Sequence, residues 1–197
     1  GDGYVEYGFF YECPNLNEII WGEGITSIPC GLFRGCSGLT EVIIPDTVTT
    51  IEPDAFLACS SLSSITIPDS VTEIGRYAFS KCTALVDITI PDNVTEIGGY
   101  AFSKCTALLN VQFGDGLTAI NEDAFSYCSS LKEVYLPDGL TDFGQGHCSV
   151  FAHCTSLEKV YIPSTLTNAW YMGDGYVEYG FFYECPNLNE IIWGEGI

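Results

Sequence analysis

A short motif that recurs at a nearly constant interval constrains the fold more than any other feature of the sequence. A phenylalanine followed three residues later by cysteine occurs eight times, at Phe10, Phe33, Phe56, Phe79, Phe102, Phe125, Phe151 and Phe182. A unit of about 23 residues cannot bury its apolar side chains alone, so neighbouring units must stack and share one core. The sequence therefore predicts a solenoid of eight coils, which begin near residues 9, 32, 55, 78, 101, 124, 150 and 181.

The central unit, residues 78–100, indicates what each coil contains. Ile88 and Ile90 flank one polar residue, an alternation typical of a strand of two or three residues. Pro91 then ends the strand, because proline has no N–H to donate. Apolar residues spaced by three elsewhere in the unit fit one turn of α- or 3₁₀-helix or a loose second strand. We therefore expect an α/β repeat, with one parallel strand per coil and short helical, 3₁₀ or extended segments opposite.

The full repeat pattern is C-x-x-L-x-x-I-x-I-P-x-x-V-T-x-I, which is read from Cys59 to Ile74 and again from Cys82 to Ile97. It resembles leucine-rich repeats of the BspA type, and the resemblance covers nearly the whole chain. It implies a single domain over residues 1–197, a leucine-rich repeat solenoid with its parallel sheet on the concave face. Proteins of this type are typically bacterial or protist surface and secreted proteins with roles in adhesion. The resemblance therefore implies an extracellular or cell-surface location.

Charge and hydropathy argue against two classes of partner. The 197 residues include 26 acidic and 6 basic side chains, which gives a formal net charge of −20. Nucleic acid and anionic membranes would repel such a chain, and no apolar run approaches the roughly 18 to 20 residues of a membrane span. We expect no nucleic-acid partner and no membrane insertion. No nucleophile or carboxylate has a partner that spacing would bring to it, so we also expect no enzymatic activity and no cofactor.

One position in each expected strand faces outward, and its residues form the candidate ligand-binding strip. In leucine-rich repeats this column lines the concave face. Tyr135 and Tyr161 are candidate anchors, because tyrosine offers a large contact area with a polar tip. However, β-propensity alone also selects isoleucine, threonine and tyrosine on an exposed sheet, so both interpretations stay open. The strip consists of Ile20, Ile43, Thr66, Thr89, Gln112, Tyr135, Tyr161 and Ile192.

Eight of the ten cysteines occupy the motif position and should stack as a column. In-register side chains point the same way, whereas a disulfide needs Cβ atoms that converge to about 3.8 Å. We therefore predict buried free thiols, which behave as small apolar groups. Cys30 and Cys148 lie outside the column and five coils apart, too far to bridge each other. The column consists of Cys13, Cys36, Cys59, Cys82, Cys105, Cys128, Cys154 and Cys185.

Two further columns each have a structural and a functional interpretation. An aspartate column follows the strands, and it either binds calcium or repeats an Asx turn with one carboxylate per coil. A threonine column either carries glycans or forms hydroxyl ladders along the solenoid. The aspartates are Asp46, Asp69, Asp92, Asp115 and Asp138, and the threonines are Thr26, Thr49, Thr72, Thr95, Thr118, Thr141 and Thr167.

Both histidines lie close to two cysteines. His147, Cys148, His153 and Cys154 fall within eight residues, a composition that suits zinc. Cys154, however, belongs to the buried column, and its neighbour Phe151 is expected in the core. We therefore predict that the chain has no metal site.

The sequence also repeats at a longer interval. Residues 173–197 are identical to residues 1–25, including exposed positions, which requires a recent duplication, an introduced one, or a window on a longer periodic chain. A terminal coil without a neighbour exposes apolar side chains and unpaired strand backbone groups. The coil at one end of a molecule can therefore pair with the coil at the opposite end of another copy. We therefore expect a structural building block that continues end to end into an array or filament of copies. The alternative is an adhesion or recognition module that binds an extracellular protein or glycan on its concave face.

Overall fold

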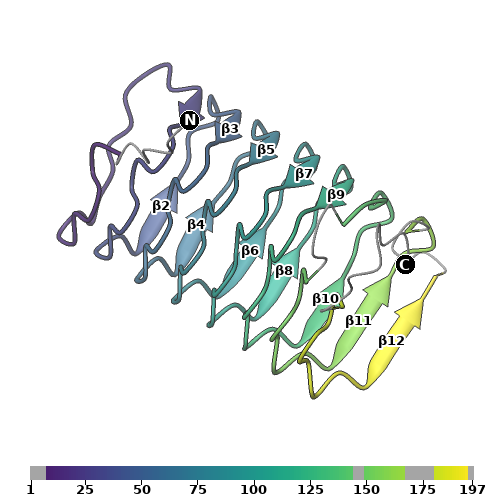
Figure 1. Ribbon diagram of the computed structural model, residues 1–197. Coiled ribbons are helices and arrows are strands. Elements are labelled where there is room, and N and C mark those ends of the chain that lie inside the picture. The colour runs from purple at the N-terminus through teal and green to yellow at the C-terminus, as the bar shows by residue number, and fades with distance from the viewer. Residues whose placement is uncertain (1–7, 144–148, 167–179, 195–197) are drawn as a thin grey trace, which may run out of the picture.

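The computed structural model describes residues 8–143, 149–166 and 180–194, which form a parallel-strand β-solenoid (Figure 1). Each coil from the one near residue 32 onward contributes one longer strand, and from β1 to β9 the coils also contribute a strand of two residues. The longer strands are β2 (Glu41–Ile43), β4 (Ser64–Thr66), β6 (Asp87–Thr89), β8 (Asn110–Gln112), β10 (Glu133–Tyr135), β11 (Lys159–Ile162) and β12 (Glu190–Trp193). The shorter strands are β1 (Ser27–Ile28), β3 (Thr50–Ile51), β5 (Glu73–Ile74), β7 (Glu96–Ile97) and β9 (Ala119–Ile120).

The strands pair in parallel, in the register that the repeat period imposes. The shorter strands form one five-stranded sheet in the order β1-β3-β5-β7-β9, in which Ile51 lies opposite Ile74 and Ile74 opposite Ile97. The longer strands pair as β2-β4, β6-β8 and β10-β11-β12, and they follow one another along the length of the molecule (Figure 1). Residues 23 positions apart therefore become direct neighbours.

The described residues contain no helix, so the α/β expectation is not confirmed. The segment after β3 runs through successive turns instead. Asp54 and Ala58 have φ angles of 60° and 61°, and such left-handed residues interrupt a right-handed helix. The N–H groups of Phe56 and Ala58 donate to the carbonyls of Ala78 and Ser80 in the next coil, at 2.8 and 2.7 Å. Alternate N–H groups thus close local turns and link neighbouring coils, which leaves no continuous helical ladder.

About six complete coils are formed, so the expected count of eight is not confirmed either. In the coil that begins near residue 9, no strand forms at Glu18–Ile20, and Ile20 is 88% exposed. A physical reason is that the Trp21 indole N–H donates to the Ile43 carbonyl at 2.8 Å. One coil on, the corresponding acceptor, the Thr66 carbonyl, receives the backbone N–H of Ile44 instead. The coil that begins near residue 181 contributes β12, whose side chains are also exposed.

A stack of phenylalanine rings runs through the core. The rings of consecutive motif phenylalanines lie nearly parallel, with centroids between 5.1 and 5.8 Å apart. Phe33 and the five rings from Phe56 to Phe151 are buried, and the stack continues outward to the exposed Phe10 at one end and the half-buried Phe182 at the other. Such stacked aromatic pairs add to the stabilisation that burial of their apolar area provides.

The cysteine column is confirmed as free thiols. Six of its members are buried, whereas Cys13 and Cys185 are half-buried. Each Sγ from Cys36 onward donates to the motif phenylalanine carbonyl of the preceding coil, as Cys105 does to Phe79 at 3.2 Å. All but the first of these carbonyls also accept the N–H of the motif cysteine in their own coil, as Phe79 does from Cys82 at 3.2 Å, so the thiol supplies a second hydrogen bond to the same oxygen. Cys148 lies outside the described residues, and Cys30 is free and exposed.

Candidate functional site

The longer strands bring seven of the eight predicted strip residues onto one face in matching positions. Ile43 lies opposite Thr66, and Thr89 opposite Gln112. Tyr161 lies between Tyr135 and Ile192. The residue before the strip position is buried in five of these strands, as Val42, Ile65, Ile88, Val134 and Val160, whereas Val111 is half-buried and Ile191 is exposed. The remaining strip residue, Ile20, is exposed outside any strand.

Tyr135 and Tyr161 are neighbours on the strip, and their rings contact each other. Their rings stack with centroids 4.0 Å apart and an angle of 13° between the planes. The Tyr135 hydroxyl donates to a Glu133 carboxylate oxygen at 2.7 Å, and hydrogen bonds with Tyr161 and Glu133 raise the pKa of Tyr135. Lys159 Nζ pairs with Glu190 at 2.8 Å and lies 5.7 Å from the centre of the Tyr161 ring. The two tyrosines thus offer a stacked aromatic surface, and the neighbouring charges of Lys159 and Glu190 are paired with each other.

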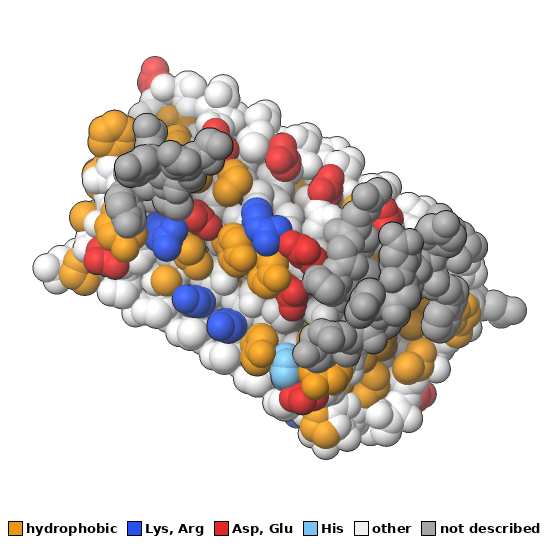
Figure 2. Space-filling view, in the orientation of Figure 1, with side chains coloured by type: hydrophobic (Ala, Val, Ile, Leu, Met, Phe, Trp, Pro, Cys, Tyr) orange, Lys and Arg blue, Asp and Glu red, His pale blue; other side chains and the backbone are white. Residues whose placement is uncertain are grey.

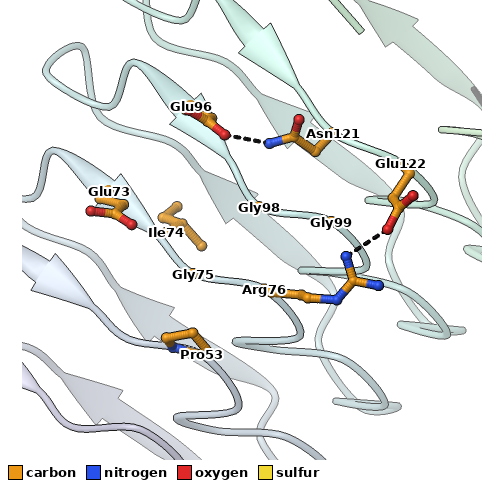
Figure 3. A pocket seen from close by; sticks show the side chains of 10 residues that line it. All are labelled: Pro53, Glu73, Ile74, Gly75, Arg76, Glu96, Gly98, Gly99, Asn121 and Glu122. Atoms are coloured by element: carbon orange, nitrogen blue, oxygen red, sulfur yellow. Dashed lines mark hydrogen bonds and ion pairs between the residues drawn. The ribbon is translucent and has the colours of Figure 1, made fainter. Parts of the chain in front are cut away.

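A hollow beside the shorter strands was not predicted from the sequence (Figure 3). It has a volume of about 350 Å³ and lies where Gly75 and Gly98 follow the last residues of β5 and β7. The sequence signal for it is an E-I-G run in two successive coils. A Cβ atom at Gly75 or Gly98 would lie 2.6 Å from a backbone nitrogen of the preceding coil, so only glycine fits this close approach of the backbones.

The polar groups around this hollow are largely matched to one another. Arg76 points at Glu122 and forms an ion pair at 2.5 Å, and Asn121 points at Glu96 (Figure 3). The guanidinium also lies 4.8 Å from the centre of the Tyr100 ring. Because these charges already have partners, a ligand would have to replace existing contacts here, which makes the hollow a weak candidate site.

The remaining predicted columns form contacts along the solenoid. Thr49, Thr72, Thr118 and Thr141 each donate a hydroxyl hydrogen bond to the threonine carbonyl of the preceding coil, at 3.0 to 3.4 Å. These residues thus form the predicted hydroxyl ladder, whereas Thr167 lies outside the described residues. In the aspartate column, an Asp92 carboxylate oxygen accepts from the N–H of Asp115 at 3.1 Å.

No group of three or more His, Cys, Asp or Glu side chains within residues 8–143, 149–166 and 180–194 is arranged to hold a metal ion. His147 and Cys148 of the histidine–cysteine cluster lie outside these ranges. His153 Nδ1 pairs with Glu184 at 3.0 Å, while the buried Cys154 thiol donates to the Phe125 carbonyl. The two described members of the cluster therefore have separate partners.

Across the part of the chain that the structure describes, no helix is long and apolar enough to cross a membrane.

A family profile described as "BspA type Leucine rich repeat region" matches residues 4–91 and 74–197, in six copies. The fold is similar to that of a leucine-rich repeat protein of T. pallidum, with 28% identity and a TM-score of 0.63 over 79% of this chain and 73% of that one. The pneumococcal vaccine antigen PcpA is similar in fold at 18% identity, with a TM-score of 0.55 over 80% of this chain and 46% of that one.

A leucine-rich cell surface protein of Faecalibacterium prausnitzii is 27% identical and has a TM-score of 0.43, over 93% of this chain and 61% of that one. The chain therefore spans less than two thirds of two of these three proteins. No curated protein matches the chain at a significant level.

Proposed function

Because the chain belongs to the BspA-type leucine-rich repeat family, we propose that it is a non-catalytic structural module of the cell surface or extracellular space that continues end to end into an array of copies. The proposed location is supported by the cell-surface or secreted location that is typical of proteins in this family. It is also supported by the acidic composition, which disfavours nucleic acid as a partner.

The observation that carries this proposal is that one coil sequence packs against neighbours on both of its sides. Residues 8–21 and 180–193 are identical. In the first copy, the Phe10 ring stacks on Phe33 of the following coil at 5.7 Å, and the Phe10 carbonyl accepts the Cys36 thiol at 3.0 Å. This copy therefore uses the face that points toward the C-terminus of the solenoid.

The second copy uses the opposite face of the same coil sequence. The Phe182 ring stacks on Phe151 of the preceding coil at 5.8 Å, and the Cys185 thiol donates to the Phe151 carbonyl at 3.1 Å. In addition, β12 pairs in register with β11. A single copy of this coil can thus lie between the coil of Phe151 in one molecule and the coil of Phe33 in the next. Joining the molecules in this way needs no interface that the structure does not already contain.

This proposal predicts assembly that depends on salt. The net charge of −20 makes copies repel one another, and the screening length falls from about 30 Å at 0.01 M salt to about 8 Å at 0.15 M. Light scattering should therefore show elongated particles at 0.15 M salt and far fewer at 0.01 M. Electron micrographs should show an axial repeat of about seven coils, roughly 34 Å at the usual strand spacing.

Leu16→Arg together with Leu188→Arg tests the end contact, because the two changes place a charge on the half-buried apolar face of both copies of this coil. The double variant should abolish elongation while circular dichroism shows that the central coils stay folded. Thr66→Arg adds the same charge at an exposed strip position and should assemble like the parent chain. A monodisperse monomer at every salt and protein concentration would contradict the proposal.

A recognition module is the second candidate, and the stacked pair of the exposed Tyr135 and the half-buried Tyr161 favours it. Changing both residues to serine should weaken capture of a protein or glycan ligand by about 30-fold or more, since a hot-spot residue contributes at least about 2 kcal/mol. Binding to panels of immobilised glycans and extracellular matrix proteins measures this effect. Thr66→Ser and Thr89→Ser are the matched controls. Unchanged capture by the double tyrosine variant would rule out the pair as the anchor.

A further inference from the structure

A groove of about 710 Å³ runs along the turns on the face shown in Figure 2, and neither the strip nor the hollow beside the shorter strands contributes to it. One wall is a column of residues with left-handed backbone, Ala58, Lys81, Lys104, Tyr127 and His153, whose φ angles lie between 60° and 64°. Each of these residues occupies the same position in its coil, so their side chains project in a row. Figure 2 shows two blue side chains in line with an orange one and the pale blue histidine.

The two lysines of this groove are unusual in so acidic a chain. Lys81 and Lys104 are two of the six basic residues in the sequence. Arg34, Arg76 and Lys159 pair with carboxylates, whereas neither groove lysine has an acidic partner within 4.0 Å among the described residues. Both lysine side chains are exposed and one coil apart, about 4.8 Å at the strand spacing. Together they can bind one carboxylate or sulfate group from two sides.

An aromatic surface continues the row directly after the lysines. Lys104 Nζ lies 5.4 Å from the centre of the Tyr127 ring. The Tyr127 ring stacks on His153 at 4.2 Å, and Tyr183 contacts His153 edge-on at 5.5 Å. A flat ring surface beside a cationic pair suits a ligand that has an anionic group next to an apolar face. The face of a sugar ring, with its C–H groups, has this property.

The second wall of the groove carries hydroxyl groups, from Thr83, Thr106 and Ser129 among others. Thr83 donates to the Ser60 carbonyl at 3.2 Å, and the Thr106 carbonyl accepts from Ser129 at 3.4 Å. Each hydroxyl oxygen that donates in this way keeps lone pairs that can accept from a ligand. The groove thus offers a row of oxygen acceptors beside its cations, as recognition of a polyhydroxylated molecule requires.

Acidic residues lie beyond both ends of the groove. In the same left-handed column, Glu184 is one coil beyond His153 and Glu12 is two coils beyond Ala58, with φ angles of 52° and 49°. From Ala58 to His153 the groove extends over four coil spacings, or roughly 19 Å. A nucleic acid carries a charge on every nucleotide and would meet these carboxylates and the net charge of −20. A ligand with few charges is therefore favoured.

We propose that this groove binds an acidic oligosaccharide, with one carboxylate or sulfate group held between Lys81 and Lys104 and a neighbouring sugar ring packed on Tyr127 and His153. The hydroxyl wall accepts hydrogen bonds from the sugar hydroxyls. The site lies on the turns rather than on the strand face, so it operates independently of end-to-end assembly and of the tyrosine pair.

Calorimetric titration of the full chain with four probes tests this proposal. The probes are a uronic acid tetrasaccharide, a sulfated tetrasaccharide, a neutral tetrasaccharide and a single-stranded oligothymidylate. At least one acidic tetrasaccharide should bind, and the tighter of the two identifies the anionic group. The neutral probe should bind at least tenfold more weakly. Tighter binding of the oligothymidylate, or no binding of either acidic probe at millimolar concentration in 0.05 M salt, would overturn the proposal.

Variants separate the groove from general charge attraction. Changing both Lys81 and Lys104 to glutamine should weaken binding of the acidic probe at least tenfold, and Tyr127→Ser should weaken it several-fold without any change in charge. Lys132→Gln removes an exposed positive charge outside the groove and should alter the affinity less than twofold. Equal losses from Lys132→Gln and from either groove lysine changed alone would contradict a specific site. Circular dichroism melts verify that every variant is folded.

Discussion

Replacing Phe79 with alanine should lower the free energy of unfolding by about 3 to 5 kcal/mol, the usual cost of truncating a fully buried aromatic residue. Phe79 is completely buried and stacks between Phe56 and Phe102, at 5.4 and 5.3 Å. Its N–H donates to the Ala101 carbonyl at 2.8 Å. Because such backbone bonds hold the coils at a fixed spacing, the neighbouring rings cannot move in to fill the cavity. Urea unfolding followed by circular dichroism measures the loss.

Two control variants show whether the core or the charge stabilises the fold. Phe9 is 96% exposed, so Phe9→Ala should change the free energy of unfolding by less than about 0.5 kcal/mol. Asp92→Asn should be neutral or slightly stabilising, because it relieves repulsion along the aspartate column. A loss below about 1 kcal/mol for Phe79→Ala would mean that the ring stack contributes little. A large loss for Asp92→Asn that appears only with calcium present would instead indicate a metal site.

Raising the pH from 9 to 12 should destabilise the protein steeply through its buried thiols. Burial raises the pKa of Cys59 and of Cys105 from 9.0 to about 12. Between these values the thiols of the unfolded chain lose their protons while those of the folded chain keep them. The stabilisation of the folded state by its protonated thiols is therefore complete below pH 9, and it is lost as the pH rises toward 12. Each thiol contributes about 1.4 kcal/mol per pH unit, or about 4 kcal/mol over this range.

The decrease in the free energy of unfolding that two such thiols cause is comparable with the total stability of a typical domain, about 5 to 15 kcal/mol. Urea unfolding between pH 8 and 11.5, with a reductant present, measures the slope of the free energy of unfolding against pH. Cys105→Ala should make this slope shallower by about 1.4 kcal/mol per pH unit, while tyrosine and lysine ionisation affects both chains equally. An identical slope in the two chains would show that the Cys105 thiol ionises as readily in the fold as in the unfolded chain.

The repeat period was sufficient to predict the solenoid and its core columns. A position that recurs every 23 residues must meet its own copies when coils stack, which is why the Phe56–Phe79 contact, the free thiols and the Tyr135–Tyr161 pair could be anticipated. The sequence left open a helical turn, a 3₁₀ turn or a loose second strand opposite the longer strands, and the described residues form short strands and turns there. A residue every three positions fits a helix as well as a series of turns.

Backbone conformation decides between these alternatives, and the sequence carries only a faint signal for it. Asp54 and Ala58 are left-handed without being glycine. One coil earlier, however, Gly31 and Gly35 occupy the same two positions, with φ angles of 63° and 75°. Glycine is the usual residue for this conformation. These two glycines therefore indicate that the corresponding positions of the other coils are left-handed as well. The groove of Lys81 and Tyr127 was missed for the same reason, because only the left-handed turn places those side chains in one row.

The hydrogen bonds that alternate between local turns and neighbouring coils determine how the molecule responds to a pulling force. The bonds between coils run along the axis of the solenoid, so tension applied to its two ends acts first on the outermost coil rather than on all coils together. One coil occupies about 4.8 Å of the axis, but its 23 residues extend to about 80 Å once they are released. A molecule anchored on a surface under shear would therefore lengthen in steps of one coil, absorbing the load at one end while the remaining coils stay folded.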